Sequence, residues 1–542
     1  MKYIKLCIVS LFPRSRFLPK DKIKVGYNKL VENRMIQNLN DLTFVLIKND
    51  HDSKNDLKFQ KNILDIPMDK ILQIHNQWKS TRLLQTPNFL AALSLSVAYG
   101  KQFIYPLTKE WIVEISKSGI KINKVISPIL FKFLLLSKCL VSFKKTLVFL
   151  CNSIHKNHIN FDNSSPLTRA VYIPNLQLGH LSGDFEYNFI GWLKRKESAT
   201  SNLAVFHSNS KISDKDWYQD NVTLQFIDLR LRWNSGVLKD FIFRLTLVLK
   251  CFLNFIRLNN KGIVLSHFYE IVTAKYVCAA LPVNTFSYSL FDQSQGSLLP
   301  LWASVLNDRG TRSIIFFYAT AADLELELGK KFKPSLWANI SWEEIWVIDK
   351  TQRLSLQSVV LNTKTKFREI GVPDWIDTNV IIPKISPAIV LFDSEPQQNL
   401  YYLSSNISLG MFTEEFYERF FHDILEKAKY YNFSIIHKSK KDTSKHCEPF
   451  YNEIRSNLGS KYSNYHIIDS AIAPKKLLES SVASICQPPS TTALIARSLN
   501  LPTIYYDPLN KINPKDQILR GIPLVYPTDL KTWFDNLRKG LN

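Results

Sequence analysis

The C-terminal third of the chain alternates between short apolar runs and amphipathic stretches, and this alternation constrains the fold more than any other feature. The run Ala388–Asp393 is apolar until its last residue, which is typical of a strand buried on both faces of a parallel sheet. A helical pattern over Phe412–Tyr431 follows, with apolar residues returning to one face every three or four positions. Further strands are predicted at Phe433–His437, Tyr465–Ile468, Val482–Cys486 and Pro502–Tyr506, with helices between them. Strict alternation of strands and helices predicts an α/β fold with a doubly wound parallel sheet.

The chain upstream shows the same alternation less regularly, and its 542 residues are too many for one simple core. Strands are predicted there at Phe44–Ile47, Ala170–Ile173, Leu203–His207, Leu224–Ile227, Gly262–Ser266 and Ser313–Tyr318. We predict an N-terminal α/β domain over residues 1–340, a linker and strand region over 341–385, and a C-terminal Rossmann-like domain over 386–542. The two Rossmann-type domains are expected to face each other across a cleft.

Three consecutive hydroxyl residues open the helix that follows the strand Val482–Cys486. A helix start has unpaired backbone N–H groups and a partial positive charge, so it suits a phosphate. Ser490, Thr491 and Thr492 add side-chain donors at the carboxyl end of a strand, where open parallel sheets bind ligands. Ser490 is equally explained as a simple helix cap, so the sequence leaves both interpretations open.

Two other predicted strand ends should lie at the same edge of this sheet. His437 and Lys438 close the strand that begins at Phe433, and they supply two kinds of donor for a phosphate. Asp393 ends the first strand of the domain, where the following loop commonly contacts a nucleotide. These residues, together with the three hydroxyls, are our candidates for the nucleotide-binding site.

The N-terminal half offers candidates for a general base in the polar loop that follows Ile173. His180, Asp184 and Glu186 lie there around two glycines, and a carboxylate such as Asp184 or Glu186 would deprotonate an acceptor hydroxyl. Other acids compete for this role, namely Asp292, Asp323 and Glu325. The absence of GxxxxGK[ST], HExxH and GxSxG motifs argues against P-loop phosphoryl transfer, zinc proteolysis and α/β-hydrolase chemistry.

The formal net charge of +22 calls for an anionic partner. The stretches Val125–Cys151 and Val237–Leu258 are apolar but interrupted by basic residues, so they predict amphipathic helices. Such helices either lie in a lipid headgroup layer or pack on the core with a solvated basic stripe. Because the basic residues are not interleaved with exposed aromatics, we expect an anionic membrane surface rather than nucleic acid as the partner. Seven scattered cysteines without a CxxC pair are typical of a cytoplasmic protein with reduced thiols.

The segments IIHKSKKD and PPSTTALIARSLNLPTIYYDP resemble the C-terminal half of bacterial GT-B-type transferases that build lipopolysaccharide and capsule, of the sialyltransferase and Kdo-transferase kind. In sialyltransferase-like members, a His-Pro motif and a Ser/Thr pair hold the phosphate of the donor nucleotide. His437 matches the histidine, and Ser490 and Thr491 match the pair, whereas Lys438 replaces the proline. The His-Pro form goes with CMP-sugars, so Lys438 leaves the donor nucleotide open. The acidic base motif of these enzymes has no clean match here.

The resemblance implies a GT-B-like, metal-independent glycosyltransferase without a cofactor. It would move a sugar from a nucleotide-sugar to a growing cell-surface polysaccharide or lipid-linked glycan, at the inner face of the cytoplasmic membrane. Teichoic-acid glycerophosphotransferases share a similar C-terminal ending, so a polyol-phosphate transferase using a CDP-alcohol is one alternative. A non-catalytic protein that binds polysaccharide or nucleic acid is another.

Overall fold

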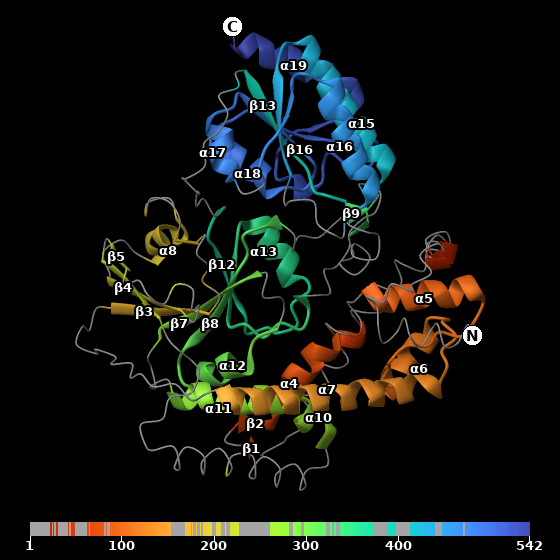
Figure 1. Ribbon diagram of the computed structural model, residues 1–542, viewed down its shortest axis with the longest axis vertical. Helices are drawn as coiled ribbons and strands as arrows, with labels where there is room; N and C mark the ends of the chain where they lie inside the picture. The colour runs from red at the N-terminus through yellow and green to blue at the C-terminus, as the bar shows by residue number, and fades with distance from the viewer. Residues whose placement is uncertain are drawn as a thin grey trace.

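The chain forms two α/β domains, described by a computed structural model (Figure 1). The structure describes residues 22–23, 25–26, 29–30, 42, 45–48, 62–63, 66–80, 83, 87–152, 168–174, 176, 180–181, 185, 188–197, 202–207, 212, 217–219, 221–226, 246, 261–280, 286–293, 298–320, 326–327, 330–331, 337–372, 385, 387–396, 412–439, 447–469 and 472–541.

The first domain is built on an eight-stranded sheet with the order β12-β11-β8-β7-β3-β4-β6-β5. Its strands are β3 (Thr168–Ile173), β4 (Asn202–His207), β5 (Trp217–Gln219), β6 (Val222–Phe226), β7 (Tyr288–Asp292), β8 (Arg312–Phe316), β11 (Glu344–Val347) and β12 (Lys366–Glu369). Neighbouring strands run parallel except for β5, which pairs with β6 in the antiparallel direction. Two short antiparallel pairs of strands lie outside this sheet: β1 (Asn62–Ile63) with β2 (Ile66–Pro67), and β9 (Leu326–Glu327) with β10 (Lys330–Lys331).

Alternate residues of this sheet point to opposite faces, and each face is covered by helices. The helices are α4 (Met68–Lys79), α5 (Pro87–Tyr99), α6 (Lys109–Lys117), α7 (Ile126–Asn152), α8 (Phe189–Glu197), α10 (Lys261–Ser266), α11 (Phe268–Ala280), α12 (Leu301–Asn307) and α13 (Lys350–Gln357). Val171 of β3 packs with α8 on one face, whereas its neighbour Tyr172 packs with α4, α11 and α12 on the other. Helices α5 and α6 and the start of α7 share a further core around Phe103 and Trp111.

The second domain has a six-stranded parallel sheet with the order β15-β14-β13-β16-β17-β18. Its strands are β13 (Ala388–Phe392), β14 (Ser434–Lys438), β15 (Tyr465–Ile467), β16 (Ala483–Cys486), β17 (Thr503–Tyr506) and β18 (Leu524–Val525). Its helices are α15 (Glu414–Tyr430), α16 (Pro449–Lys461), α17 (Pro474–Glu479), α18 (Thr491–Ser498), the short 3₁₀ helix η9 (Gln517–Leu519) and α19 (Pro527–Leu541). Helices α15, α16 and α19 cover one face, and α17 and α18 cover the other. In order along the chain the strands are arranged 3-2-1-4-5-6, which is the Rossmann order.

The carboxyl edges of the two sheets face each other. The backbone N–H of Thr320, after β8, donates to Thr491 Oγ1 at 3.0 Å, at the start of α18. A second contact joins the domains outside this edge: Arg520, which lies between η9 and β18, contacts Asp349 Oδ2, just after β11, through its Nε at 2.5 Å. Figure 1 shows the second domain (blue) stacked on this edge of the first (green and yellow). The predicted α/β fold of two facing, GT-B-like Rossmann-type domains is confirmed.

Several local predictions have mixed outcomes. Each predicted strand and helix of the C-terminal third is present. Two upstream strand predictions are wrong: Gly262–Ser266 forms part of helix α10, and residues 45–47 of the predicted strand Phe44–Ile47 are helical. The region 341–385 was predicted as a linker with a strand, and the structure places β11 and β12 of this region inside the first sheet. The predicted basic helix over Val125–Cys151 is α7, whereas the one over Val237–Leu258 lies outside the described residues.

Candidate functional site

The second sheet reverses its winding between β13 and β16, which are neighbours in space although β14 and β15 separate them in sequence. Loops that leave the carboxyl ends of two such strands diverge and leave room for a ligand. Here the loop after β13 begins at Asp393, and the loop after β16 runs from Gln487 to Ser490. Gln487 holds the two loops together, because its Oε1 accepts the N–H of Ser394 at 2.9 Å.

Ser490 is the N-cap of α18, so the capping interpretation is confirmed. Its Oγ accepts the backbone N–H of Thr492 at 3.2 Å and lies 2.5 Å from Thr492 Oγ1. Tyr505, on the neighbouring strand β17, fixes this turn: its hydroxyl donates to the Ser490 carbonyl at 3.0 Å and accepts the Ser490 N–H at 3.1 Å. Ser490, Thr491 and Thr492 are all partly exposed, so a ligand can reach this helix start.

Asp393 and His437 lie together in a buried network on the face of the sheet covered by α15 and α16. His437 Nε2 donates to Asp393 Oδ1 at 3.1 Å, and Tyr451 donates to Asp393 Oδ2 at 2.6 Å. The Tyr465 hydroxyl lies 2.5 Å from His437 Nδ1, and the side chains of His437 and Asp393 are fully buried. Both ring nitrogens of His437 therefore have protein partners.

Lys438 belongs to the opposite face of the same sheet. Neighbouring residues of a strand alternate between faces. Ile436 packs with α17 and α18, so Lys438 shares that face with the start of α18, whereas His437 does not. Burial lowers the pKa of the Lys438 amine, while Asp469 opposes this shift. The six residues predicted for the nucleotide site thus divide into Asp393 with His437 on one face, and Lys438 with the three hydroxyl residues on the other.

The first sheet has its own reversal of winding, between β3 and β7. A small pocket lies there, lined by Ile173, His180, Phe189, Leu290, Phe291, Asp292 and Phe316. It places a histidine and a carboxylate at the carboxyl edge of β3 and β7. Burial lowers the pKa of His180, and the Asp292 carboxylate opposes that shift. Burial and the same carboxylate raise the pKa of Tyr318, which follows β8.

A short series of hydrogen bonds leads from this pocket to the start of α18. Gln293, directly after Asp292, accepts the N–H of Ala319 on its Oε1 at 3.1 Å. The next residue, Thr320, donates its N–H to Thr491 Oγ1. The two reversals of winding therefore meet at the contact between the domains, and the hydroxyl-rich helix start lies close to the chain that borders the His180 pocket.

The two predicted general bases, Asp184 and Glu186, lie outside the described residues, as do the competing acids Asp323 and Glu325. Sequence reasoning did not identify Gln487, Thr320, Tyr451 or Tyr465 as part of the site. Gln487 carried a usable signal, since it directly follows a predicted strand at the sheet edge. The described part of the chain has no group of three or more His, Cys, Asp or Glu residues placed to hold a metal ion.

Comparison with known proteins finds one matching family model and distant structural similarities. No curated protein matches the sequence. Trehalose 6-phosphate synthase from Burkholderia multivorans aligns with 69% of this chain and 89% of its own at 12% identity and a TM-score of 0.37. UDP-GlcNAc 2-epimerase from Methanocaldococcus jannaschii aligns with 68% of this chain and 92% of its own at 11% identity and a TM-score of 0.35. Similarity this low does not establish an activity.

The family model is described as a polysaccharide biosynthesis PFTS motif protein and matches residues 261–534. This match covers just over half of the 542 residues. It begins at α10, includes β7, β8, β11 and β12 of the first sheet, and extends through the second domain into α19. The residues around Asp292, Thr320 and Ser490 all lie within it. The chain therefore belongs to the family of polysaccharide biosynthesis PFTS motif proteins.

Proposed function

We propose that this protein is a glycosyltransferase that moves a sugar from a nucleotide-sugar to a growing cell-surface polysaccharide or lipid-linked glycan. Membership of a polysaccharide biosynthesis family supports this proposal. The observation that carries it is the Thr320–Thr491 contact, which joins a hydroxyl-rich helix start to the edge of a pocket containing a histidine and a carboxylate. Sugar transfer needs both elements: one holds the leaving nucleotide phosphate, and the other removes a proton from the acceptor.

On the donor side, Ser490, Thr491 and Thr492 would bind the phosphate together with backbone N–H groups of the first turn of α18. Negative charge builds on this phosphate as the bond to the sugar breaks, and donors already in place stabilise it. Lys438 is on the same face of the sheet. A bound phosphate would favour its charged form and so reverse the pKa shift caused by burial.

Asp393 and His437 serve the donor site differently in this proposal, as positioning residues. Their side chains are fully buried and bonded to each other and to Tyr451 and Tyr465. This network anchors the start of the loop after β13. That loop is hydrogen bonded to Gln487, which begins the loop leading to Ser490. The donor nucleotide stays open in this proposal, with a CMP-linked sugar as one candidate, because Lys438 stands where the resemblance has a proline.

On the acceptor side, we assign the role of general base to His180. Its pKa is lowered by burial, so its ring is uncharged at neutral pH and can take a proton. The acceptor oxygen attacks the anomeric carbon, the bond from that carbon to the phosphate oxygen breaks, and the hydroxyl proton moves to the ring. Asp292 then stabilises the protonated ring. Asp184 and Glu186 follow His180 closely in sequence and are the alternative bases.

Nucleotide binding by the full-length protein tests this function. We would measure the thermal shift with CMP, CDP, UDP, GDP and dTDP for the wild type and for Ser490→Ala/Thr491→Val. Ser498→Ala is the matched control, because Ser498 is an exposed hydroxyl at the other end of α18. At a hundred times its dissociation constant, a nucleotide adds about 2.7 kcal/mol to the free energy of unfolding.

One nucleotide should raise the melting temperature of the wild type and the control by about 5–10 °C, and the double variant should lose this shift. No shift with any nucleotide in the wild type would contradict the proposal. A larger shift with CDP-glycerol than with every nucleotide, followed by glycerol-phosphate transfer, would replace it with the polyol-phosphate transferase.

A further inference from the structure

The outer face of α7 is unusually apolar. Nine of the 17 exposed large apolar side chains among the described residues lie between Val125 and Val148. Seven of them recur at spacings of three and four residues and so form one stripe along the helix. These are Val125, Ile129, Phe133, Leu136, Leu140, Phe143 and Leu147, with exposed fractions from 45% to 70%. We call this set the α7 stripe.

The inner face of α7 mixes apolar and polar side chains: Leu130 is buried, and further apolar residues pack on the core that α7 shares with α5 and α6. Ser127, Ser142 and Thr146 are buried there. Ser142 Oγ accepts the backbone N–H of Tyr269 at 2.8 Å, at the start of α11. Lys138 lies 4.2 Å from the ring centre of Trp78 and hydrogen bonds to a buried histidine of the first domain. Besides these inward contacts, α7 therefore directs a continuous stripe of large apolar side chains away from the protein core.

The charges on α7 and on the sequence that flanks it are all of one sign. No Asp or Glu occurs between Glu114 and Asp162, whereas eight lysines do. Lys132 and Lys144 are exposed, and helical geometry places them on the two sides of the stripe. An apolar stripe flanked by lysines matches a layer with an anionic surface and an apolar interior. A second protein helix would be matched by the apolar stripe, but it would leave the lysines without partners.

We propose that α7 lies flat in an anionic membrane surface and holds the protein there, as expected at the inner face of the cytoplasmic membrane. The helix is long and apolar enough to span a bilayer over Ile126–Val148. Its inner face, however, is bonded to the first domain through Lys138 and Ser142, so the helix cannot leave that domain without breaking these contacts. Figure 1 shows α7 along the edge of the first domain that faces away from the second.

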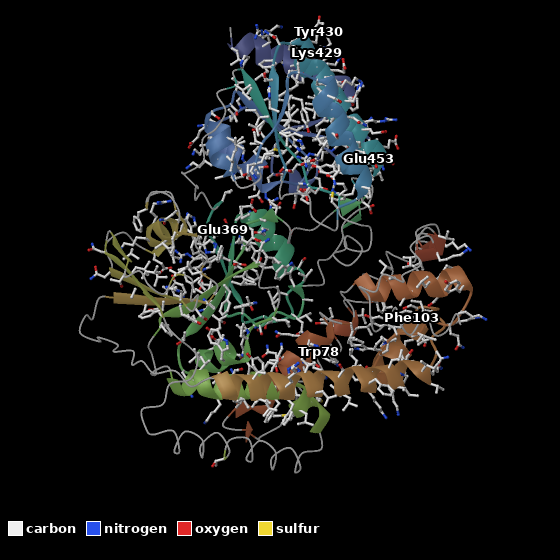
Figure 2. The ribbon with its side chains drawn as sticks, viewed as in Figure 1. Trp78, Phe103, Glu369, Lys429, Tyr430 and Glu453 are labelled. Atoms are coloured by element: carbon white, nitrogen blue, oxygen red, sulfur yellow. The ribbon has the colours of Figure 1, made fainter. Side chains whose placement is uncertain are left out.

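Vesicle flotation of the purified full-length protein tests this proposal without any reference to activity. The vesicles contain phosphatidylcholine alone or with about one third phosphatidylglycerol. Phe133→Ser/Leu140→Ser shortens the stripe, and Lys132→Gln/Lys144→Gln removes the flanking charge. The matched control is Lys429→Gln/Tyr430→Ser, which removes an exposed lysine and an exposed aromatic side chain at the far end of the second domain, where Figure 2 labels both residues.

The wild type and the control should bind the anionic vesicles and release them at high salt. Each large side chain of the stripe is worth roughly tenfold in partitioning, so the stripe variant should bind about a hundredfold more weakly. The lysine variant should lose about thirtyfold. All substituted positions are exposed, and unchanged far-ultraviolet circular dichroism spectra would verify folding.

Three results would overturn the proposal. The first is equal binding of all variants, or an absence of binding by the wild type. The second is a wild-type dimer that the stripe variant dissociates while neither floats with vesicles, since the stripe would then cover a second copy. The third is resistance of the membrane-bound protein to alkaline carbonate extraction, because this would indicate a spanning helix.

Discussion

Replacing Tyr451 by phenylalanine isolates one hydrogen bond of the buried network behind the candidate donor site. The Tyr451 hydroxyl donates to Asp393 Oδ2 at 2.6 Å, and both side chains are fully buried. Burial and the neighbouring Asp393 raise the pKa of Tyr451 well above its ordinary value, so the hydroxyl keeps its proton and remains a donor. Phenylalanine preserves the ring packing against Tyr417 and Phe421 and removes only the donor.

The expected loss of stability follows from the burial of the Tyr451–Asp393 hydrogen bond. A hydrogen bond to a charged group contributes about 1.5–3 kcal/mol, and a buried oxygen left without its donor cannot recruit water in compensation. We therefore expect Tyr451→Phe to lower the free energy of unfolding by about 2 kcal/mol. In a domain of this size, that loss lowers the melting temperature by about 4–8 °C.

Tyr462→Phe is the matched control, because Tyr462 caps the end of α16, the helix that contains Tyr451. Tyr462 is also buried and donates to a carboxylate, Glu426 Oε1, at the same distance of 2.6 Å. Glu426 is exposed, so water replaces the lost hydroxyl, and the cost should stay below about 0.5 kcal/mol. Differential scanning calorimetry of the full-length protein, fitted for the transition of the second domain, measures both losses. Equal losses in the two variants would refute the argument that burial of Asp393 makes this contact strong.

Two further predictions concern the contact between the domains and the pocket of the first sheet. Because burial lowers the pKa of His180, transferase activity should fall only as pH drops through that lowered pKa. Asp292→Asn removes a charge that raises the pKa of His180, so the acid limb of the kcat/KM profile should move to lower pH and the rate should decrease. A shift of the acid limb to higher pH would contradict the assignment of His180 as the base. Arg520→Gln removes the ion pair with Asp349 across the domains and should increase the radius of gyration measured by small-angle X-ray scattering, whereas Arg419→Gln, which removes a surface pair with Glu415 within α15, should not.

The second domain was predictable from sequence because local pattern and tertiary environment agree there. Its strands are short, mostly apolar and separated by helices with one apolar face, and the order of strands in such a sheet follows from the winding rules. The local sequence pattern and the tertiary environment did not agree in this way at Gly262–Ser266. A short apolar run suits a buried strand and a buried helix equally well, and contacts with α4 and α7 determine the outcome here.

The candidate site was predictable only in part. The position of Ser490 at a helix start followed from the prolines and hydroxyl residues around it. The separation of His437 from Lys438 followed from the two-residue period of a strand, although both residues were predicted to bind the same phosphate. Tyr451 and Tyr465 carry no local signal, because they reach His437 and Asp393 from other elements of the chain. Contacts of this kind depend on the packing of helices against the sheet.

The hydroxyl of Thr491 has a consequence for how the two domains move. It accepts the N–H of Thr320 from the first domain, and its own proton is then available to a phosphate oxygen. Each of these hydrogen bonds polarises the other, so a ligand that accepts the proton strengthens the contact between the domains. By thermodynamic reciprocity, closure of the domains must tighten the ligand by the same factor. Donor affinity in this protein would then be a property of both domains, and product release would be coupled to their separation.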